Sequence, residues 1–202
     1  MKISENIAKL ISVLFHPLLM PTIGILMIFW SGTYLSFIPF EGKRLIFVVI
    51  FAGTFVIPIS IIPFFLFFKI ISNIEIDNPS QRLAPLIIIS FLYFCTFYIM
   101  QKIPIPFINL FVLASASCVL LNTVITSWWK ISSHLLGAGG LTGLIIAMFF
   151  RLNANISLLL IISIIIAGLT GFARLRLNAH TPEQIYSGFL IGFFLVGGVL
   201  LI

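Results

Sequence analysis

Long apolar runs alternate along the chain with short groups of polar and turn-forming residues. A transmembrane helix needs about 20 apolar residues, with about 17–25 tolerated. Cutting the runs at their polar interruptions predicts seven such helices. They run from Leu10 to Ser31, Arg44 to Phe68, Pro85 to Gln101, Phe107 to Trp129, His134 to Phe150, Ile156 to Phe172 and Gln184 to Ile202. We therefore expect an all-α, polytopic membrane protein.

Prolines interrupt the first two predicted helices. Pro17 and Pro21 lie in the first, and Pro58 and Pro63 lie in the second. A proline inside a helix removes a backbone hydrogen bond and bends the axis. These bends suit helices that surround a cavity, so we expect a cavity beside the N-terminal part of the chain.

Glycines are spaced for close helix contact in two of the later helices. Gly139 and Gly143 lie four residues apart in the fifth, and Gly188 and Gly192 have the same spacing in the seventh. Small residues at this spacing let two helix backbones approach each other within a membrane. We interpret these glycines as packing positions.

Composition supports the membrane assignment and narrows the function. The chain of 202 residues is 61% hydrophobic and 8% charged, against about 45–50% and about 25% in soluble domains. These values exclude a cytosolic enzyme, a nucleic-acid-binding domain and a disordered chain. The net charge of +6 indicates phosphate headgroups or anionic ligands as partners. Cys95 and Cys118 lie within apolar runs and are interpreted as small packing residues.

Polar residues gather on one side of the predicted bundle. Successive connections alternate between the two membrane faces, so residues 69–84, 130–133 and 173–183 fall on the face that carries the N-terminus. His134 and His180 lie at or beside helix starts on this face, and His16 lies roughly 9 Å into the first helix from it. A convergent set of polar residues at a membrane face is by default a functional-site hypothesis. His16 by itself is interpreted as a hydrogen-bonded structural residue.

The expected chemistry is phosphoryl transfer. A helix that begins at His134, with Ser132 and Ser133 at its cap, directs backbone N–H groups at an anion. Charge-assisted hydrogen bonds to phosphate would come from Arg82, Lys130 and Arg174. One neutral imidazole can attack phosphorus while a second, protonated imidazole protonates the leaving oxygen. This chemistry needs no cofactor, and we expect none.

The same residues resemble the motifs of the type 2 phosphatidic acid phosphatase superfamily. Arg174 precedes His180 with five residues between them, as in the third motif, S-R-x5-H-x3-D. Ser132-Ser133-His134 lies where the family has P-S-G-H, and Arg82 lies where the first motif, K-x6-R-P, would be. The resemblance covers residues 69–202, which would form the catalytic core. Residues 1–68 would form two kinked accessory transmembrane helices within a single membrane domain.

The resemblance implies a role for each matched residue. His180 would be the nucleophile that forms a phosphohistidine, and His134 would be the general acid. The phosphoryl group would be bound by Arg82, Arg174, Ser132 and Ser133, and Lys130 would supply the ammonium missing from the first motif. The implied function is metal-independent hydrolysis of a lipid phosphate or polyprenyl pyrophosphate whose tail stays in the bilayer.

One departure from the motif concerns the partner of the nucleophile. Gln184 stands where the family has an aspartate that orients the histidine and stabilises its positive charge. Thr181-Pro182-Glu183-Gln184 also has the pattern of a capping box, in which Gln184 serves the helix start. Glu183 would then be the alternative carboxylate partner of His180. A catalytically impaired protein that binds or moves phospholipid is therefore the second hypothesis.

A metal site is the third hypothesis. Zinc ligands in a transporter or hydrolase would be His16, His134, His180 and Glu183, although their spacing fits no metal signature.

The N-terminal face holds 7 lysines and arginines and the other face 4, which by itself favours a cytoplasmic N-terminal face. Setting aside the three proposed phosphate ligands leaves 4 on each face. Small size indicates a bacterial inner-membrane protein, and the resemblance favours a periplasmic site.

Overall fold

The computed structural model describes residues 2–72 and 79–202, and its regular structure there is helical. Within these residues, seven helical spans are long and apolar enough to cross a membrane, which confirms the predicted number. They are Ile3–Phe29, Phe40–Phe67, Gln81–Met100, Pro106–Thr126, Ser133–Leu152, Ser157–Arg176 and Pro182–Leu201. The protein is a polytopic helical membrane protein, as its sequence predicts.

The first span is broken in the middle. It consists of α1 (Lys2–Leu14), a 3₁₀ turn (η1, Pro17–Leu19) and α2 (Met20–Phe29). His16 has an extended backbone with ψ of 137°, because the residue before a proline is sterically excluded from the helical region. Pro17 therefore bends the chain as predicted, whereas Pro21 lies in the first turn of α2, where its missing N–H costs nothing.

The second span stays helical throughout, with a π-helical turn between its two α-helices. It follows η2 (Tyr34–Phe37) and consists of α3 (Phe40–Phe51), a π-helical turn (η3, Ala52–Val56) and α4 (Ile57–Phe67). The wider turn immediately precedes Pro58, whose ring would otherwise meet the carbonyl of Thr54. Pro63 lies inside α4.

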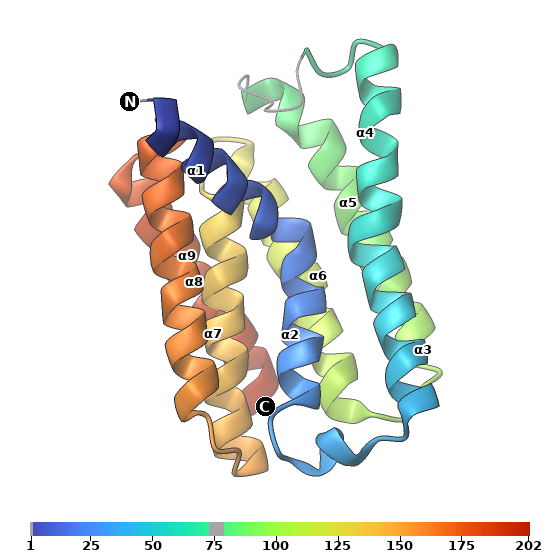
Figure 1. Cartoon of the computed structure of the whole chain (residues 1–202). Coiled ribbons are helices and arrows are strands. Elements are labelled where there is room, and N and C mark those ends of the chain that lie inside the picture. Colours follow the sequence, from blue (N-terminus) through green and yellow to red (C-terminus); the bar gives the residue numbers. More distant parts are fainter. Residues whose placement is uncertain (1, 73–78) are drawn as a thin grey trace.

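The remaining spans are α5 (Pro79–Met100), α6 (Pro106–Thr126), α7 (Ser133–Leu152), α8 (Ser157–Arg176) and α9 (Pro182–Leu201). Figure 1 shows α7, α8 and α9 side by side, with α2 and α6 beside them and α3, α4 and α5 at the opposite edge. The N-terminus and the α6–α7 and α8–α9 connections lie at one end of the bundle, and the C-terminus lies at the other. The predicted assignment is confirmed for these two connections and the termini, whereas residues 73–78 of the predicted 69–84 connection lie outside the described residues.

Glycines hold α7 and α9 in close contact, as their spacing predicts. A Cβ atom at Gly192 would meet the backbone oxygen of Leu136, and one at Gly139 would meet the backbone oxygen of Phe189. A Cβ atom at Gly188 would lie 2.7 Å from the Ser132 oxygen, at the start of α7. Close packing thus fixes the beginnings of these two helices next to each other.

Candidate functional site

A cavity of about 790 Å³ opens at the N-terminal end of the bundle. Its lining there is polar and basic and includes Lys9, His16, Arg82, Lys130, Ser133, His134, Arg174 and His180. Deeper in the helical bundle the lining is mostly apolar and includes Leu18, Leu86, Ile89, Tyr93, Phe111, Val119 and Leu141. Arg82 and Tyr93 lie eleven residues apart on α5, so the cavity descends roughly 16 Å along that helix.

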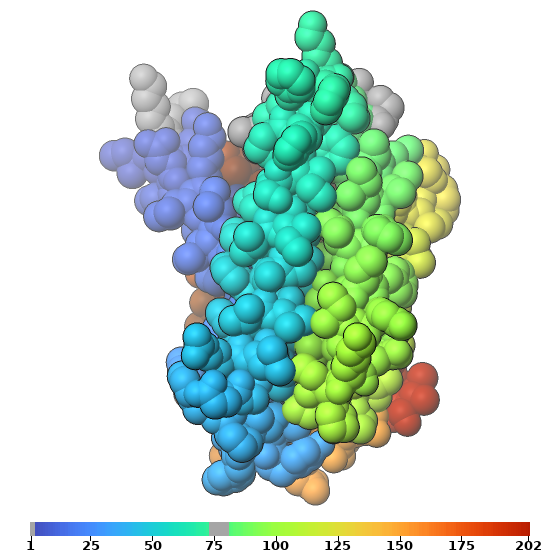
Figure 2. Space-filling view, turned by 90° about the vertical axis from the view of Figure 1, so that its right-hand side faces the viewer, coloured from blue at the N-terminus to red at the C-terminus, as the bar shows by residue number. Residues whose placement is uncertain are grey.

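The cavity lies beside a hollow in the side of the molecule. Figure 2 shows the surface hollowed between α1 and α4 at the N-terminal end of the bundle. Val13 of α1 and Ile62 of α4 line the cavity from these two helices. The hollow therefore lies next to the part of the cavity that α1 and α4 line.

The end of α8 explains the spacing between Arg174 and His180. Asn178 has a left-handed backbone with φ of 50°, which asparagine tolerates better than most residues. Its N–H donates to the Leu175 oxygen at 3.0 Å, and the Ala179 N–H donates to the Arg174 oxygen at 3.1 Å. These two bonds form a Schellman motif that turns the chain back. Arg174 and His180 thereby reach the same cavity.

His180 lies just before α9 and is only 8% exposed. Its Nδ1 lies 3.0 Å from Oε1 of Gln184, and Oε1 also accepts the Thr181 N–H at 3.2 Å. Because the Thr181 group is a donor, the Gln184 atom between them is the amide oxygen, which can only accept. The Nδ1 atom of His180 therefore carries the hydrogen, and the lone pair of the neutral ring is on Nε2.

The sequence offers Gln184 and Glu183 as partners of the His180 ring, and in the structure Gln184 makes this contact. It forms the predicted capping box with Thr181 and also contacts His180. Glu183, by contrast, is exposed and hydrogen-bonded to Thr181, and it does not line the cavity. The hypothesis that Glu183 is the carboxylate partner of His180 is therefore corrected: the partner in the structure is the amide of Gln184.

The surroundings of His180 favour its neutral form. Burial lowers the pKa of the His180 ring to about 4, and the hydrogen bond that the ring donates to Gln184 opposes part of this shift. The positive charges of Arg174, Arg82 and Lys130 lower the pKa further. The structure thus brings these three predicted phosphate ligands close enough to act on His180.

The start of α7 is built as predicted, one residue earlier than the sequence pattern placed it. Ser132 is the N-cap, its Oγ accepts the Leu135 N–H at 3.5 Å, and its own N–H donates to the Gln184 oxygen at 3.2 Å. Ser132 is fully buried and does not reach the cavity, whereas Ser133 lines it. Asn122 of α6 donates to Ser133 Oγ at 2.9 Å. The sequence analysis missed Asn122, although an asparagine within an apolar span is a signal for such a role.

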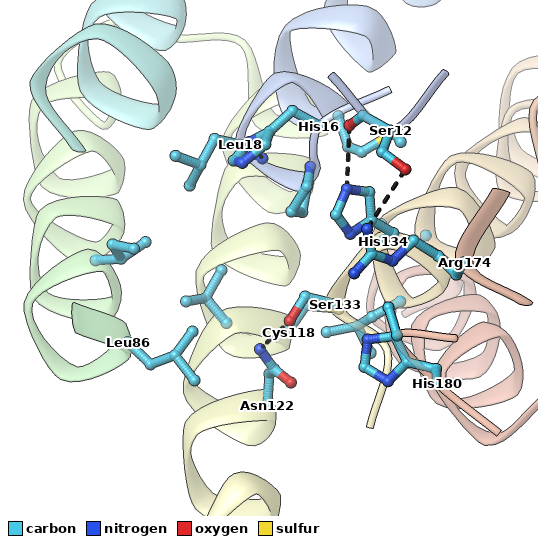
Figure 3. Close-up of a pocket in the computed structure, with 18 of the residues that line it drawn as sticks. Ser12, His16, Leu18, Leu86, Cys118, Asn122, Ser133, His134, Arg174 and His180 are labelled. Carbon is cyan, nitrogen blue, oxygen red and sulfur yellow. Dashed lines mark hydrogen bonds between the residues drawn. The ribbon is translucent and has the colours of Figure 1, made fainter. Parts of the chain in front are cut away.

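Ser12 of α1 is a second residue that the sequence analysis missed. Nε2 of His134 lies 3.1 Å from the Ser12 backbone oxygen, and Arg174 Nη1 donates to Ser12 Oγ at 3.4 Å (Figure 3). A carbonyl oxygen only accepts, so Nε2 of His134 carries a hydrogen and Nδ1 is its other position for a proton. No local pattern marks Ser12, because its partners are brought to it by the packing of α1 on α8.

The N-terminal spans are therefore part of the site. The predicted division placed the catalytic core in residues 69–202 and treated residues 1–68 as accessory helices, although the metal hypothesis included His16. Ser12 and His16 nevertheless line the same cavity as His134, Arg174 and His180. This difference arises because the break at Pro17 turns α1 across the N-terminal end of the bundle (Figure 1).

A metal cluster is not supported. Among residues 2–72 and 79–202, no group of three or more His, Cys, Asp or Glu side chains is placed to hold a metal ion. The proposed zinc set fails because Glu183 lies outside the cavity that His16, His134 and His180 line. Cys95 and Cys118 are free thiols, as expected for packing residues.

Comparisons of the chain with protein-family models, curated proteins and solved structures found no match.

Proposed function

We propose that this protein is a metal-independent phosphatase of lipid phosphates or polyprenyl pyrophosphates that acts through a phosphohistidine, in the manner of type 2 phosphatidic acid phosphatases. The observation that carries the proposal is the unprotonated Nε2 of His180 within a cluster of three cationic side chains. Gln184 directs the hydrogen of the ring to Nδ1, and Arg174, Arg82 and Lys130 lie close enough to shift the pKa of the ring.

The proposed reaction begins with the Nε2 lone pair of His180. It attacks phosphorus, a P–N bond forms, and the bond from phosphorus to the leaving oxygen breaks with its electron pair on oxygen. His134, protonated on both nitrogens, donates its Nδ1 proton to that oxygen while Nε2 stays bonded to the Ser12 carbonyl. Water then attacks phosphorus and gives one proton to His134. A P–O bond forms, the P–N bond breaks with its electron pair on Nε2 of His180, and phosphate is released. Arginines and the lysine neutralise the phosphoryl oxygens throughout.

The shape of the cavity supports a substrate with an apolar tail. A phosphate at the basic end would lie at the depth of the lipid headgroups, and the apolar part below it could receive the first carbons of an acyl or isoprenoid chain. The hollow between α1 and α4 would let the rest of the lipid tail remain in the bilayer. The proposed partners are thus membrane lipids that carry a phosphate.

The experiment that tests the function is phosphate release by purified protein in detergent with EDTA present. The substrates are phosphatidic acid, phosphatidylglycerophosphate, undecaprenyl pyrophosphate and lipid A. We expect release by the wild type and loss of at least about 10³-fold in His180→Asn, because the nucleophile is removed. Arg174→Ala should also lose activity, whereas Arg44→Ala, an exposed arginine on the opposite face, should not. Turnover retained by His180→Asn would contradict the nucleophile assignment.

A second candidate function is lipid binding without hydrolysis. The amide of Gln184 next to His180 favours it, because an amide orients the ring but does not stabilise its positive charge. Binding of a lipid phosphate without phosphate release, in folded protein, would support this function in place of the first.

The proposed location is the bacterial inner membrane, with the site on the periplasmic side. Multi-pass insertion follows from the seven spans, and the basic cluster accounts for the excess of positive charge on the N-terminal face.

A further inference from the structure

His16 lies at the bend between α1 and η1 and lines the basic end of the cavity. Its ring is 5.8 Å from the His134 ring, centroid to centroid, with the two planes at 74°. His134 in turn shares Ser12 with Arg174. Figure 3 shows these side chains around the same part of the cavity. A single phosphate-sized anion there would be within reach of more than one of them.

The hydrogen bonding of His16 decides what its ring can offer. The backbone N–H of Leu18 donates to Nδ1 of His16 at 3.3 Å, which makes His16 the N-cap of η1. Because an N–H only donates, Nδ1 accepts and carries no hydrogen. The ring is then neutral, with its hydrogen on Nε2. Within the described part of the chain, the hydrogen bonds of His16 use Nδ1 and leave Nε2 for the cavity.

We propose that His16 is a further phosphate-binding residue, a neutral imidazole that donates its Nε2 hydrogen to an oxygen of the phosphoryl group. The identity of the anion rests on the proposed phosphatase function. A neutral donor held by a backbone N–H adds a directed hydrogen bond without adding another charge to a site that already holds several cations. A neutral imidazole fixed at a helix N-terminus serves as an electrophile in the same manner in triosephosphate isomerase.

The proposal also gives the bend at Pro17 a function. His16 is extended because a proline follows it. Its side chain accepts the Leu18 N–H because that group lies in the first turn of η1 and has no partner within the helix. The same bend places the carbonyl and hydroxyl of Ser12 at His134 and Arg174. Residues 12–16 therefore supply both a phosphate-binding group and the contacts that position two others.

The variant that isolates this role is His16→Asn. Asparagine is a good N-cap, so its Oδ1 can still accept the Leu18 N–H, but the donor that Nε2 provides is removed. The readout is inhibition of phosphate release by orthovanadate, which resembles the five-coordinate transition state. Loss of a hydrogen bond to the charged vanadate should weaken its binding and raise the inhibition constant about 10–100-fold. The melting temperature should remain that of the wild type.

The controls separate this proposal from the proposed function. Vanadate inhibition of His16→Asn equal to that of the active wild type would overturn the role of His16 alone. Wild-type protein that releases no phosphate but binds vanadate, with binding weakened in His16→Asn, would support the anion contact and overturn the phosphatase. Direct vanadate binding replaces inhibition as the readout in that case.

A second measurement uses the unmutated protein and does not depend on the folding of a variant. The chain has 3 histidines, so 15N-histidine labelling gives a simple NMR spectrum of the ring nitrogens. We expect the His16 ring to show a protonated Nε2 and an unprotonated Nδ1, with the Nε2 hydrogen shifting downfield when orthovanadate is added. A proton on Nδ1, or an Nε2 signal that vanadate leaves unchanged, would overturn the proposal.

Discussion

Gln184 Oε1 lies 3.0 Å from Nδ1 of His180 and also accepts the backbone N–H of Thr181 at 3.2 Å. One amide oxygen thus closes the cap of α9 and fixes the tautomer of the histidine before it. The sequence analysis treated capping and catalytic support as alternatives. In the structure one oxygen makes both the cap bond and the contact with the ring, because His180 precedes the N-cap by one residue.

Gln184→Glu tests whether a negative charge beside His180 would increase activity. Glutamate keeps the chain length, so one carboxylate oxygen can occupy the position of Oε1 and serve both the cap and the ring. Its charge would stabilise the positive His180 that forms during attack. We expect phosphate release to rise at least about tenfold. Gln101→Glu, an exposed glutamine on the opposite face, is the matched control. An unchanged or lower rate would mean that the amide is already sufficient.

We expect the His180 ring to become protonated only at low pH. Burial and the cations Arg174, Arg82 and Lys130 lower its pKa to about 4, against about 6.5 in the unfolded chain. Between pH 6.5 and 4 the unfolded chain therefore binds a proton that the folded protein does not, so this group makes stability fall as the pH falls through that window. NMR titration of the ring, assigned with His180→Asn, should give a midpoint near pH 4. A midpoint at 6.5 or above would contradict the neutral nucleophile.

The contact between α7 and α9 should tolerate no added methyl group. A Cβ atom at Gly192 would meet the Leu136 backbone oxygen, whereas one at Gly198, on the same helix, would have no atom within 4 Å. We expect Gly192→Ala to destabilise the protein by about 1–3 kcal/mol and Gly198→Ala to leave stability unchanged. Melting temperatures in detergent would show the difference. Equal melting temperatures would mean that the helices can separate without cost.

The membrane orientation can be measured with a pair of exposed asparagines. Asn6 lies on α1 at the N-terminal face, and Asn155 lies in the α7–α8 connection at the other. In a parent chain in which Cys95 and Cys118 are replaced, a periplasmic site predicts that Asn6→Cys reacts with an impermeant thiol reagent in intact cells. Asn155→Cys should react only after permeabilisation. The reverse pattern would place the site in the cytoplasm.

The local parts of the site were predictable because each depends on residues close together in the chain. Arg174 and His180 reach the same cavity through a Schellman turn of six residues, and Ser132 caps the helix that it immediately precedes. Gln184 reaches Thr181 and His180 within one turn. In each case the backbone geometry of a helix end leaves few alternatives, so spacing was sufficient.

The number of passes was determined by the sequence itself, since the thickness of a bilayer sets the length of each apolar helix and successive passes must alternate in direction. Only the tertiary structure showed that Ser12 contacts His134 and Arg174, whereas the alternation of passes already placed His16 on their face. Ser12 lies 122 residues from His134 and 162 from Arg174 in the chain. Contacts over such separations depend on the angle of the bend at Pro17 and on how α1 packs against α8, and no local pattern of residues encodes either.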